Sequence, residues 1–186
     1  MTWLALAAVL LAGTQAFATM VRQMNLGEMT ANADRIVHGT VTSIETGTVT
    51  AGGAELPIIK YQVRIAEVLK GNVSPNEDNL IDVIMIGSLK TNTRSGELTQ
   101  FHNVFEGPNL RSGNQYLLFL TRPSSIGLST TVGVGQGAFR FLNDGTVMNE
   151  AKNVGLFRDM DGQGLPASGP INYSALEGRI QQLLGN

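Results

Sequence analysis

Cysteine is absent from this chain of 186 residues. Its absence excludes a disulfide framework, a thiolate zinc site and cysteine catalysis. Charged residues are also scarce, at 15%, and the net charge of −2 argues against the basic surface of a nucleic-acid-binding protein. The chain does contain 42% hydrophobic residues, which is too many for a disordered chain and enough for a domain with a sizeable core.

Long apolar runs are missing as well, with one exception at the N-terminus. Residues Trp3 to Ala12 form a ten-residue apolar run, which is short of the roughly 20 residues that a membrane-spanning helix needs. Ala16 and Ala18 then supply small residues at the −3 and −1 positions of a cleavage site. We therefore predict a signal peptide over 1–18 that is cleaved after Ala18, with a buried N-terminal helix as the alternative. The mature chain is then one domain, 19–186, periplasmic or secreted, without a transmembrane segment.

β-Branched residues and alternating hydrophobicity predict six or so strands. Apolar and polar residues alternate most clearly from Ile59 to Ile65, and Gln115 to Thr121 is the continuous apolar run of a strand buried on both faces. Gly39 predicts a bulge within its strand. The predicted strands are 36–46, 59–70, 80–86, 115–121, 130–142 and 146–148. We expect a loop over 47–57 and irregular structure over 87–111.

Capping boxes predict a helix at each end of this β region. Asn25 and Glu28 begin a short one, and Ser174 and Glu177 begin a second one that carries an apolar stripe. Gly185 follows where a helix-ending glycine belongs. Because strands and helices do not alternate, we expect a mainly β, antiparallel fold with a short N-terminal helix and a C-terminal amphipathic helix.

Four segments resemble a group of exported bacterial domains of unassigned activity. They are Ala33 to Val41 (A-D-R-I-V-H-G-T-V), Tyr61 to Gly71 (ending V-L-K-G), Gly113 to Leu120, and Gly135 to Arg140 (G-Q-G-A-F-R). Together they span about residues 25 to 145. The group in turn resembles the five-stranded OB barrel of the tissue inhibitors of metalloproteinases. The resemblance implies an antiparallel OB-like barrel for this chain.

The same resemblance implies little about chemistry. The inhibitor family chelates the zinc of the protease through an N-terminal cysteine. Here the predicted mature N-terminus is Thr19, and the chain has no cysteine. No functional residue of that family can therefore be carried over to this sequence.

Residues suited to catalysis are few. His38 and His102 are the two candidates for a base that works near neutral pH. A run that starts like a calcium loop at Asp159 has Pro170 at the twelfth place, where a bidentate Glu is required. The series Gly133, Gly135 and Gly137 lacks the strand–turn–helix setting of a dinucleotide site, and close backbone approach is the favoured interpretation. We predict no metal, no cofactor and no enzymatic activity.

Three functional hypotheses follow. The leading one is an exported, non-catalytic binding domain for an unknown ligand or an exported protein partner. The alternative is an inhibitor of an exported metallopeptidase, with the free amine of Thr19 on the zinc. The third is an enzyme that uses paired carboxylates from the set Asp34, Glu67, Asp82 and Glu106.

The irregular segment 87–111 is the predicted binding region. Binding residues concentrate on loops held by a rigid scaffold, and aromatic and Arg side chains often dominate interfaces. The predicted binding residues are Phe101, His102, Phe105 and Arg111. The alternative is that Phe101 and Phe105 pin the loop to the barrel.

Overall fold

The computed structural model describes residues 22–91, 98–101, 107–160 and 166–185. The predicted signal peptide and Thr19 lie outside these residues, so both stay predictions. None of the described helices is long and apolar enough to cross a membrane.

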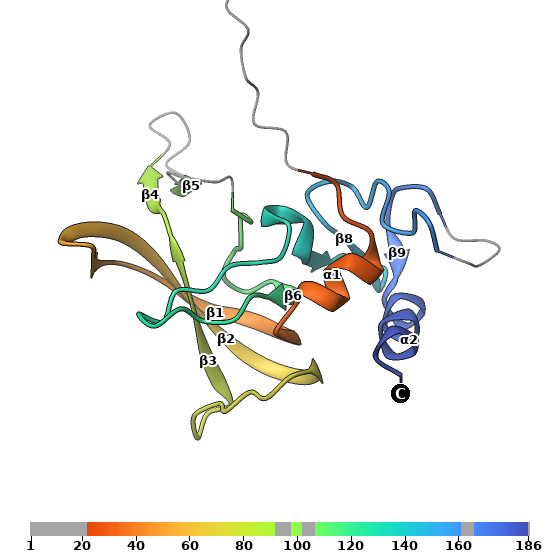
Figure 1. The fold of residues 1–186 in the computed structure, drawn as a ribbon, viewed down its shortest axis with the longest axis horizontal. Helices are drawn as coiled ribbons and strands as arrows, with labels where there is room; N and C mark the ends of the chain where they lie inside the picture. Colours follow the sequence, from red (N-terminus) through yellow and green to blue (C-terminus); the bar gives the residue numbers. More distant parts are fainter. Residues whose placement is uncertain (1–21, 92–97, 102–106, 161–165, 186) are drawn as a thin grey trace, which may run out of the picture.

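Seven strands form one antiparallel sheet in the order β3-β2-β1-β6-β7-β8-β9. Their bounds are Arg35–Ala51 (β1), Ala54–Lys70 (β2), Leu80–Ile86 (β3), Gln115–Leu120 (β6), Ala138–Phe141 (β7), Thr146–Met148 (β8) and Ile171–Asn172 (β9). A separate hairpin joins β4 (Ser88–Thr91) to β5 (Leu98–Phe101). The long β1–β2 hairpin extends away from the two helices, α1 (Leu26–Asn32) and α2 (Tyr173–Leu184), as Figure 1 shows. The expected mainly β, antiparallel fold with a helix near each end is confirmed.

The sheet is open, so the word barrel describes it only loosely. Strand β3 lies at one edge and β9 at the other. An isolated bridge joins Ile84 of β3 to Leu128, and the Ser129 N–H donates to the Ile84 carbonyl at 2.8 Å. These contacts bring the β3 edge close to the segment at Leu128 and Ser129, but no strand of the sheet joins the two edges into a closed barrel.

Three of the expected segments differ from the structure. Within 87–111, which was expected to be irregular, β4 and β5 pair as an antiparallel hairpin. The expected loop 47–57 is the paired outer half of the β1–β2 hairpin, which turns at Gly52 and Gly53 with φ of 59° and 81°. Cross-strand pairing outweighed the glycine and proline content of this segment. The expected strand 130–142 is a strand only over 138–141, and it is preceded by a 3₁₀ turn at Val134–Gly137. Gly133 has φ of 63°, and that left-handed backbone breaks the extended conformation.

Glycine at position 39 has the predicted role. The β1–β2 register shifts between His38 and Gly39, which is the signature of a bulge. A Cβ atom on Gly39 would lie 2.6 Å from the Arg64 carbonyl oxygen. The two strands therefore approach each other more closely here than any other residue type would allow.

Both helix ends follow capping rules, with one correction. Asn25 and Glu28 form the predicted capping box of α1. Helix α2 is capped by Asn172, whose side chain accepts from the backbone N–H groups of Ser174 and Ala175, so the predicted Ser174 cap is wrong by two residues. Gly185 ends α2 with φ of 80°, as predicted.

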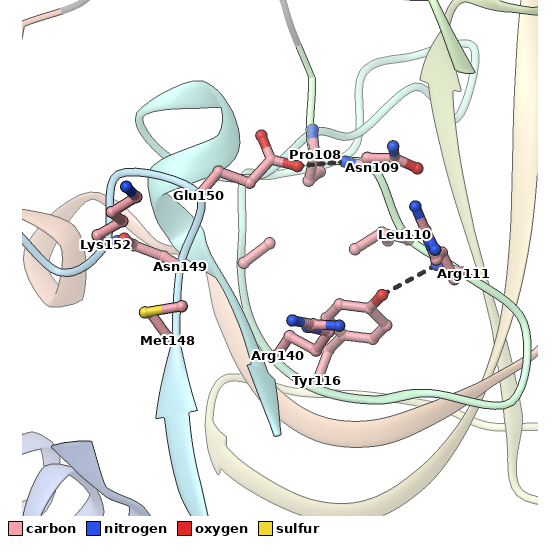
Figure 2. A pocket seen from close by; sticks show the side chains of 11 residues that line it. Pro108, Asn109, Leu110, Arg111, Tyr116, Arg140, Met148, Asn149, Glu150 and Lys152 are labelled. Carbon is pink, nitrogen blue, oxygen red and sulfur yellow. Dashed lines mark hydrogen bonds between the residues drawn. The ribbon is translucent and has the colours of Figure 1, made fainter. Parts of the chain in front are cut away.

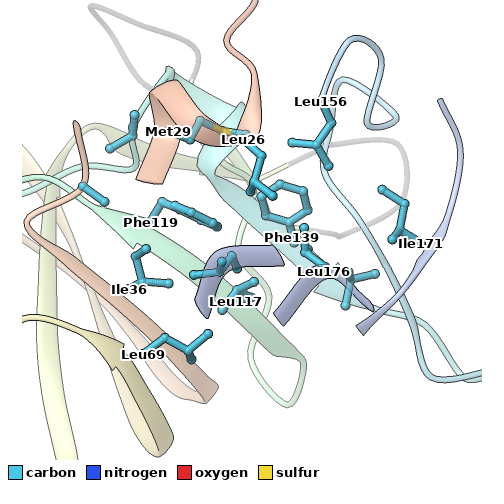
Figure 3. Packing of buried hydrophobic residues seen from close by; sticks show 14 residues of the cluster. Leu26, Met29, Ile36, Leu69, Leu117, Phe119, Phe139, Leu156, Ile171 and Leu176 are labelled. Atoms are coloured by element: carbon cyan, nitrogen blue, oxygen red, sulfur yellow. The ribbon is translucent and has the colours of Figure 1, made fainter. Parts of the chain in front are cut away.

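The core consists of two hydrophobic clusters on opposite faces of the sheet. Leu117 and Phe119 of β6 belong to the helix-side cluster, together with Leu26, Met29, Phe139 and Leu176 (Figure 3). Leu118 and Leu120 face the other way into the inner cluster, with Val37, Tyr61 and Val63. Strand β6 is therefore buried on both faces, as its continuous apolar run predicts.

Candidate functional site

A pocket of about 340 Å³ opens beside the beginning of β6. We call it the basic pocket. The segment before β6, strands β6 and β7, and the turn after β8 surround it (Figure 2). Its lining residues are Pro108, Asn109, Leu110, Arg111, Tyr116, Ala138, Arg140, Met148, Asn149, Glu150 and Lys152.

The sheet supplies the inner wall of the basic pocket. Tyr116 pairs directly with Arg140 across β6 and β7, so both side chains leave the same face. Ala138 precedes Arg140 by two residues and lies on that face as well. Because Leu110, Tyr116 and Ala138 are members of the inner cluster, this wall is continuous with the core, and Arg140 adds a cation to it.

Two hydrogen bonds hold the segment before β6 over the pocket. The Arg111 N–H donates to the Tyr116 hydroxyl at 3.0 Å, and the Asn109 N–H donates to Glu150 Oε1 at 2.7 Å. Figure 2 shows both bonds as dashed lines. The segment is thus attached both to the sheet and to the turn after β8.

Two buried asparagines hold the turn that carries Lys152. The Asn149 N–H donates to the Asn153 side-chain oxygen at 2.9 Å, and the Asn153 N–H donates back to Asn149 at 2.8 Å. Lys152 and Asn153 both have left-handed backbone, with φ of 54° and 57°. This reciprocal pair, which we call the asparagine clasp, stabilises a turn conformation that residues other than glycine rarely adopt.

The charges around the basic pocket are unbalanced. Arg111, Arg140 and Lys152 supply three cations, and Glu150 is the one carboxylate in the lining. Within the described residues none of the three cations forms an ion pair. A pocket with three unpaired cations attracts an anion, and arginine forks match the oxygens of carboxylate and phosphate groups.

The predicted binding residues have different positions relative to this pocket. Arg111 lines it. Phe101 ends β5, where its backbone pairs with Ser88. His102 and Phe105 lie outside the described residues, so their predicted role stays a prediction. The sequence did not single out Arg140, Glu150 or Lys152, although Arg140 ends the quoted G-Q-G-A-F-R segment.

His38 lies on the other face of the sheet, under α2. Its ring stacks on Phe141 with centroids 4.5 Å apart and contacts Tyr173 at 5.2 Å. Its Nε2 is buried without a hydrogen-bond partner among the described residues. Burial lowers the pKa of His38, and the nearby Glu67 carboxylate partly opposes that effect. The contacts place the His38 ring in a packed, aromatic environment.

Acidic side chains near His38 share the same surroundings. The Tyr173 hydroxyl donates to Glu67 Oε2 at 3.0 Å. Burial and the Glu67 carboxylate raise the pKa of Glu177. We call the set His38, Glu67, Tyr173 and Glu177 the helix-side ionisable cluster, and Phe141 packs against two of its rings.

The four carboxylates of the third hypothesis have separate environments. Asp34 accepts from Arg122 at 3.1 Å, whereas Glu67 accepts from Tyr173. Asp82 is exposed on β3 opposite Gln62, and Glu106 lies outside the described residues. Within the residues that the structure describes, no three His, Cys, Asp or Glu side chains are grouped as a metal site requires.

Comparison with known proteins adds no family. No protein-family model matches the chain, and no curated protein matches it at a significant level. The resemblance to exported domains and to the metalloproteinase inhibitors therefore stays a prediction.

Proposed function

We propose that this chain is an exported, non-catalytic binding domain whose basic pocket takes an oxyanion. The anion is either a small ligand or a carboxylate on an exported protein partner. One observation carries the proposal: Arg111, Arg140 and Lys152 come from three separate segments, line one pocket and form no ion pair within the described chain. Cations placed this way attract negative charge and fix its position.

The residue types that line the basic pocket are better suited to binding a ligand than to catalysing a reaction. Among the eleven lining residues there is no histidine, cysteine, serine or threonine. Glu150, the acidic member, is engaged by the Asn109 N–H. A nucleophile beside an oriented base is the usual requirement for covalent catalysis, and the lining offers cations and amides instead.

Calorimetric titration tests the proposal directly. The mature chain is titrated with sodium phosphate, sodium succinate and a short acidic peptide at fixed ionic strength. We expect saturable binding of at least one of them. Affinity should fall as salt is added, because the cations are exposed and salt screens them.

Removing one cation from the basic pocket tests whether the anion binds there. Arg140→Gln should weaken binding about tenfold, which is the loss of one charge-assisted hydrogen bond. Arg179→Gln on α2 is the matched control and should leave affinity unchanged, since Arg179 contacts Gln182 and lies outside the pocket lining. Equal affinity of the Arg140→Gln and wild-type proteins, or binding of none of the probes, would contradict the proposal.

Export has its own test. N-terminal sequencing of the protein recovered from the periplasm or the medium should begin at Thr19. A protein recovered from the cytoplasm with Met1 intact would contradict export and leave the pocket proposal standing.

A further inference from the structure

The outer half of the β1–β2 hairpin has a strand edge that no described strand covers. Strand β6 pairs with β1 only as far as Thr40. The segment before β6 reaches Thr42, whose carbonyl accepts from the Ser112 hydroxyl at 2.9 Å. Over 43–51, β1 pairs with β2 alone among the described residues, and the hairpin projects from the body of the molecule (Figure 1). We call the side of 43–51 that faces away from β2 the free edge.

The hairpin at the free edge is open to solvent on both faces. Residues 45–48 are all exposed, and successive side chains of a strand point to opposite faces. A two-stranded hairpin alone is only marginally stable in water, and a third strand stabilises it. Natural edges usually carry lysine or proline to prevent strand addition, whereas residues 46–51 contain neither charge nor proline. The free edge is therefore suited to pairing with another strand.

Three threonines direct their backbone groups toward the free edge. Pro57, which pairs with Thr48, has no N–H, and its carbonyl accepts from the Gly87 N–H at 2.9 Å, on the far side of β2. Thr48 and Pro57 therefore exchange no hydrogen bond, and such pairs alternate along an antiparallel ladder. It follows that Thr46, Thr48 and Thr50 present their N–H and carbonyl groups outward.

The free edge is complementary to itself. In an antiparallel pair centred on Thr48, this residue lies opposite Thr48 of a second copy, and Thr46 lies opposite Thr50. The outward backbone groups then face one another, and each of these pairs exchanges two hydrogen bonds. Threonine pairs are favourable across strands. Glu45 lies opposite Ala51, so no like charges meet.

This register also fits the space beside β1. The turn of the second copy, Gly52 and Gly53, lies opposite Ile44 and Ser43. It therefore ends just before Thr42, where the segment before β6 begins to cover the edge. A slip of one residue would place outward threonine groups opposite residues whose backbone groups bond to β2, so alternation along the strand specifies the register.

We propose that the free edge is a homodimer interface, at which β1 of one copy pairs antiparallel with β1 of a second copy. The two hairpins then form a four-stranded ribbon in the order β2-β1-β1-β2, with the two-fold symmetry that is most common among homo-oligomers. The interface is narrow, so the dimer dissociates on dilution. The proposal is independent of the function proposed for the basic pocket, whose lining contains no residue of β1.

Sedimentation equilibrium of the mature chain tests this proposal. We expect the mass to rise from monomer to dimer as protein concentration increases. Thr48→Pro removes an outward N–H and leaves the bonds to β2 in place, so this variant should stay monomeric. Thr48→Val is the matched control, because it keeps that N–H, and it should dimerise as the wild type does. A wild-type protein that is monomeric at every concentration, or undiminished dimerisation of Thr48→Pro, overturns the proposal.

A charge exchange at Thr48 tests the register. Thr48→Lys and Thr48→Glu each place like charges opposite each other in the dimer, so each variant alone should dimerise at least about tenfold more weakly than the wild type. Mixing the two variants should restore a dimer, because Lys then lies opposite Glu. Circular dichroism checks that each variant is folded. Should Thr48→Pro fail to fold, this exchange decides, and a mixture that remains monomeric overturns the proposal.

Discussion

Arg140 and Phe141 are neighbours in β7 and face opposite sides of the sheet. On the Arg140 side, the three cations of the basic pocket stand around an opening and have no carboxylate partner in the described chain. On the Phe141 side, the His38 and Tyr173 rings pack against Phe141 at 4.5 and 4.8 Å, and α2 covers them. Adjacent residues thus belong to two environments with opposite electrostatic balance.

The difference between the two faces suggests that one contributes mainly to folding stability and the other mainly to ligand binding. The helix-side groups contact one another, as the Tyr173–Glu67 hydrogen bond illustrates. The cations of the basic pocket have no such partners within the described chain. Under our proposal, a bound anion pairs with them. Substitutions on the helix side should therefore change the free energy of unfolding, whereas substitutions around the pocket should change affinity.

The largest expected effect is on the helix side. Leu176 of α2 is fully buried, and Leu176→Ala should lower the free energy of unfolding by about 3 kcal/mol because it leaves a cavity. Leu183→Ala on the same helix is the control; its side chain is 42% exposed, and the change should stay within about 0.5 kcal/mol. Urea unfolding measures both. Equal losses of unfolding free energy in the two variants would show that burial of the apolar side chains of α2 does not stabilise its packing.

Two glycines before β7 give the next largest contrast. A Cβ on Gly137 would lie 2.6 Å from the Val132 carbonyl oxygen, and backbone cannot move aside, so Gly137→Ala should destabilise by about 2 to 3 kcal/mol. A Cβ on Gly135 would meet the Glu150 carboxylate, which can rotate away. Gly135→Ala should therefore cost about 1 kcal/mol, through the lost Glu150–Asn109 hydrogen bond. Thermal unfolding of both variants, with anion titration of Gly135→Ala, checks the pair.

Lowering the pH should lower the free energy of unfolding through His38 on the helix side. The pKa of His38 is lowered in the folded protein, so below its ordinary value of 6.5 the unfolded chain binds this proton more readily. The stability contribution of neutral His38 is thus lost as the pH falls from 7 toward its folded pKa. The loss should be below about 1 kcal/mol, because the group is partly exposed and solvent screens it.

His38→Phe isolates this effect, since Phe keeps the stacked ring and removes the titration. Between pH 7 and 5.5 its unfolding free energy should fall less than that of the wild type. Glu177 acts in the opposite direction: its pKa is raised, so the stability it contributes when protonated is lost as the pH rises above 4.5. Parallel pH profiles for the two proteins would contradict the assignment to His38.

The smallest expected effect belongs to the pocket. Glu150→Gln removes the one carboxylate of the lining and keeps an oxygen that accepts from the Asn109 N–H. Anion affinity should rise roughly two- to fivefold, the size of an exposed charge interaction. Stability should barely change. Weaker anion binding in this variant would indicate that Glu150 holds the ligand itself.

Local sequence signals predicted the elements that local chemistry determines. The Asn25–Glu28 capping box, the Gly185 helix end and the apolar run of β6 are all confirmed. The 47–57 loop was predicted from its glycines and proline, but these residues pair along a long hairpin. The two halves of the segment pair with each other, and the glycines that favoured a loop supply only the turn at Gly52 and Gly53.

The basic pocket could be predicted only in part. Arg111 was singled out as an arginine in the irregular segment, because arginines often dominate interfaces, and the structure places it in the pocket lining. Arg140 joins it through sheet register, which depends on tertiary pairing, and Lys152 joins it through the asparagine clasp, a turn held by two side chains four residues apart. An exposed arginine and a lysine in a turn carry no sequence signal of their own.

The two walls of the basic pocket are held by contacts that differ in sequence separation, and the asparagine clasp is the shorter of them. Asn149 and Asn153 are four residues apart, so the clasp closes a very short loop. One of the two bonds that hold the opposite wall, the Asn109–Glu150 bond, joins residues 41 apart. The entropy lost in closing a loop grows with its length. The clasp around Lys152 therefore needs only its own neighbourhood in the chain, whereas the Asn109–Glu150 bond needs the intervening strands to be in place.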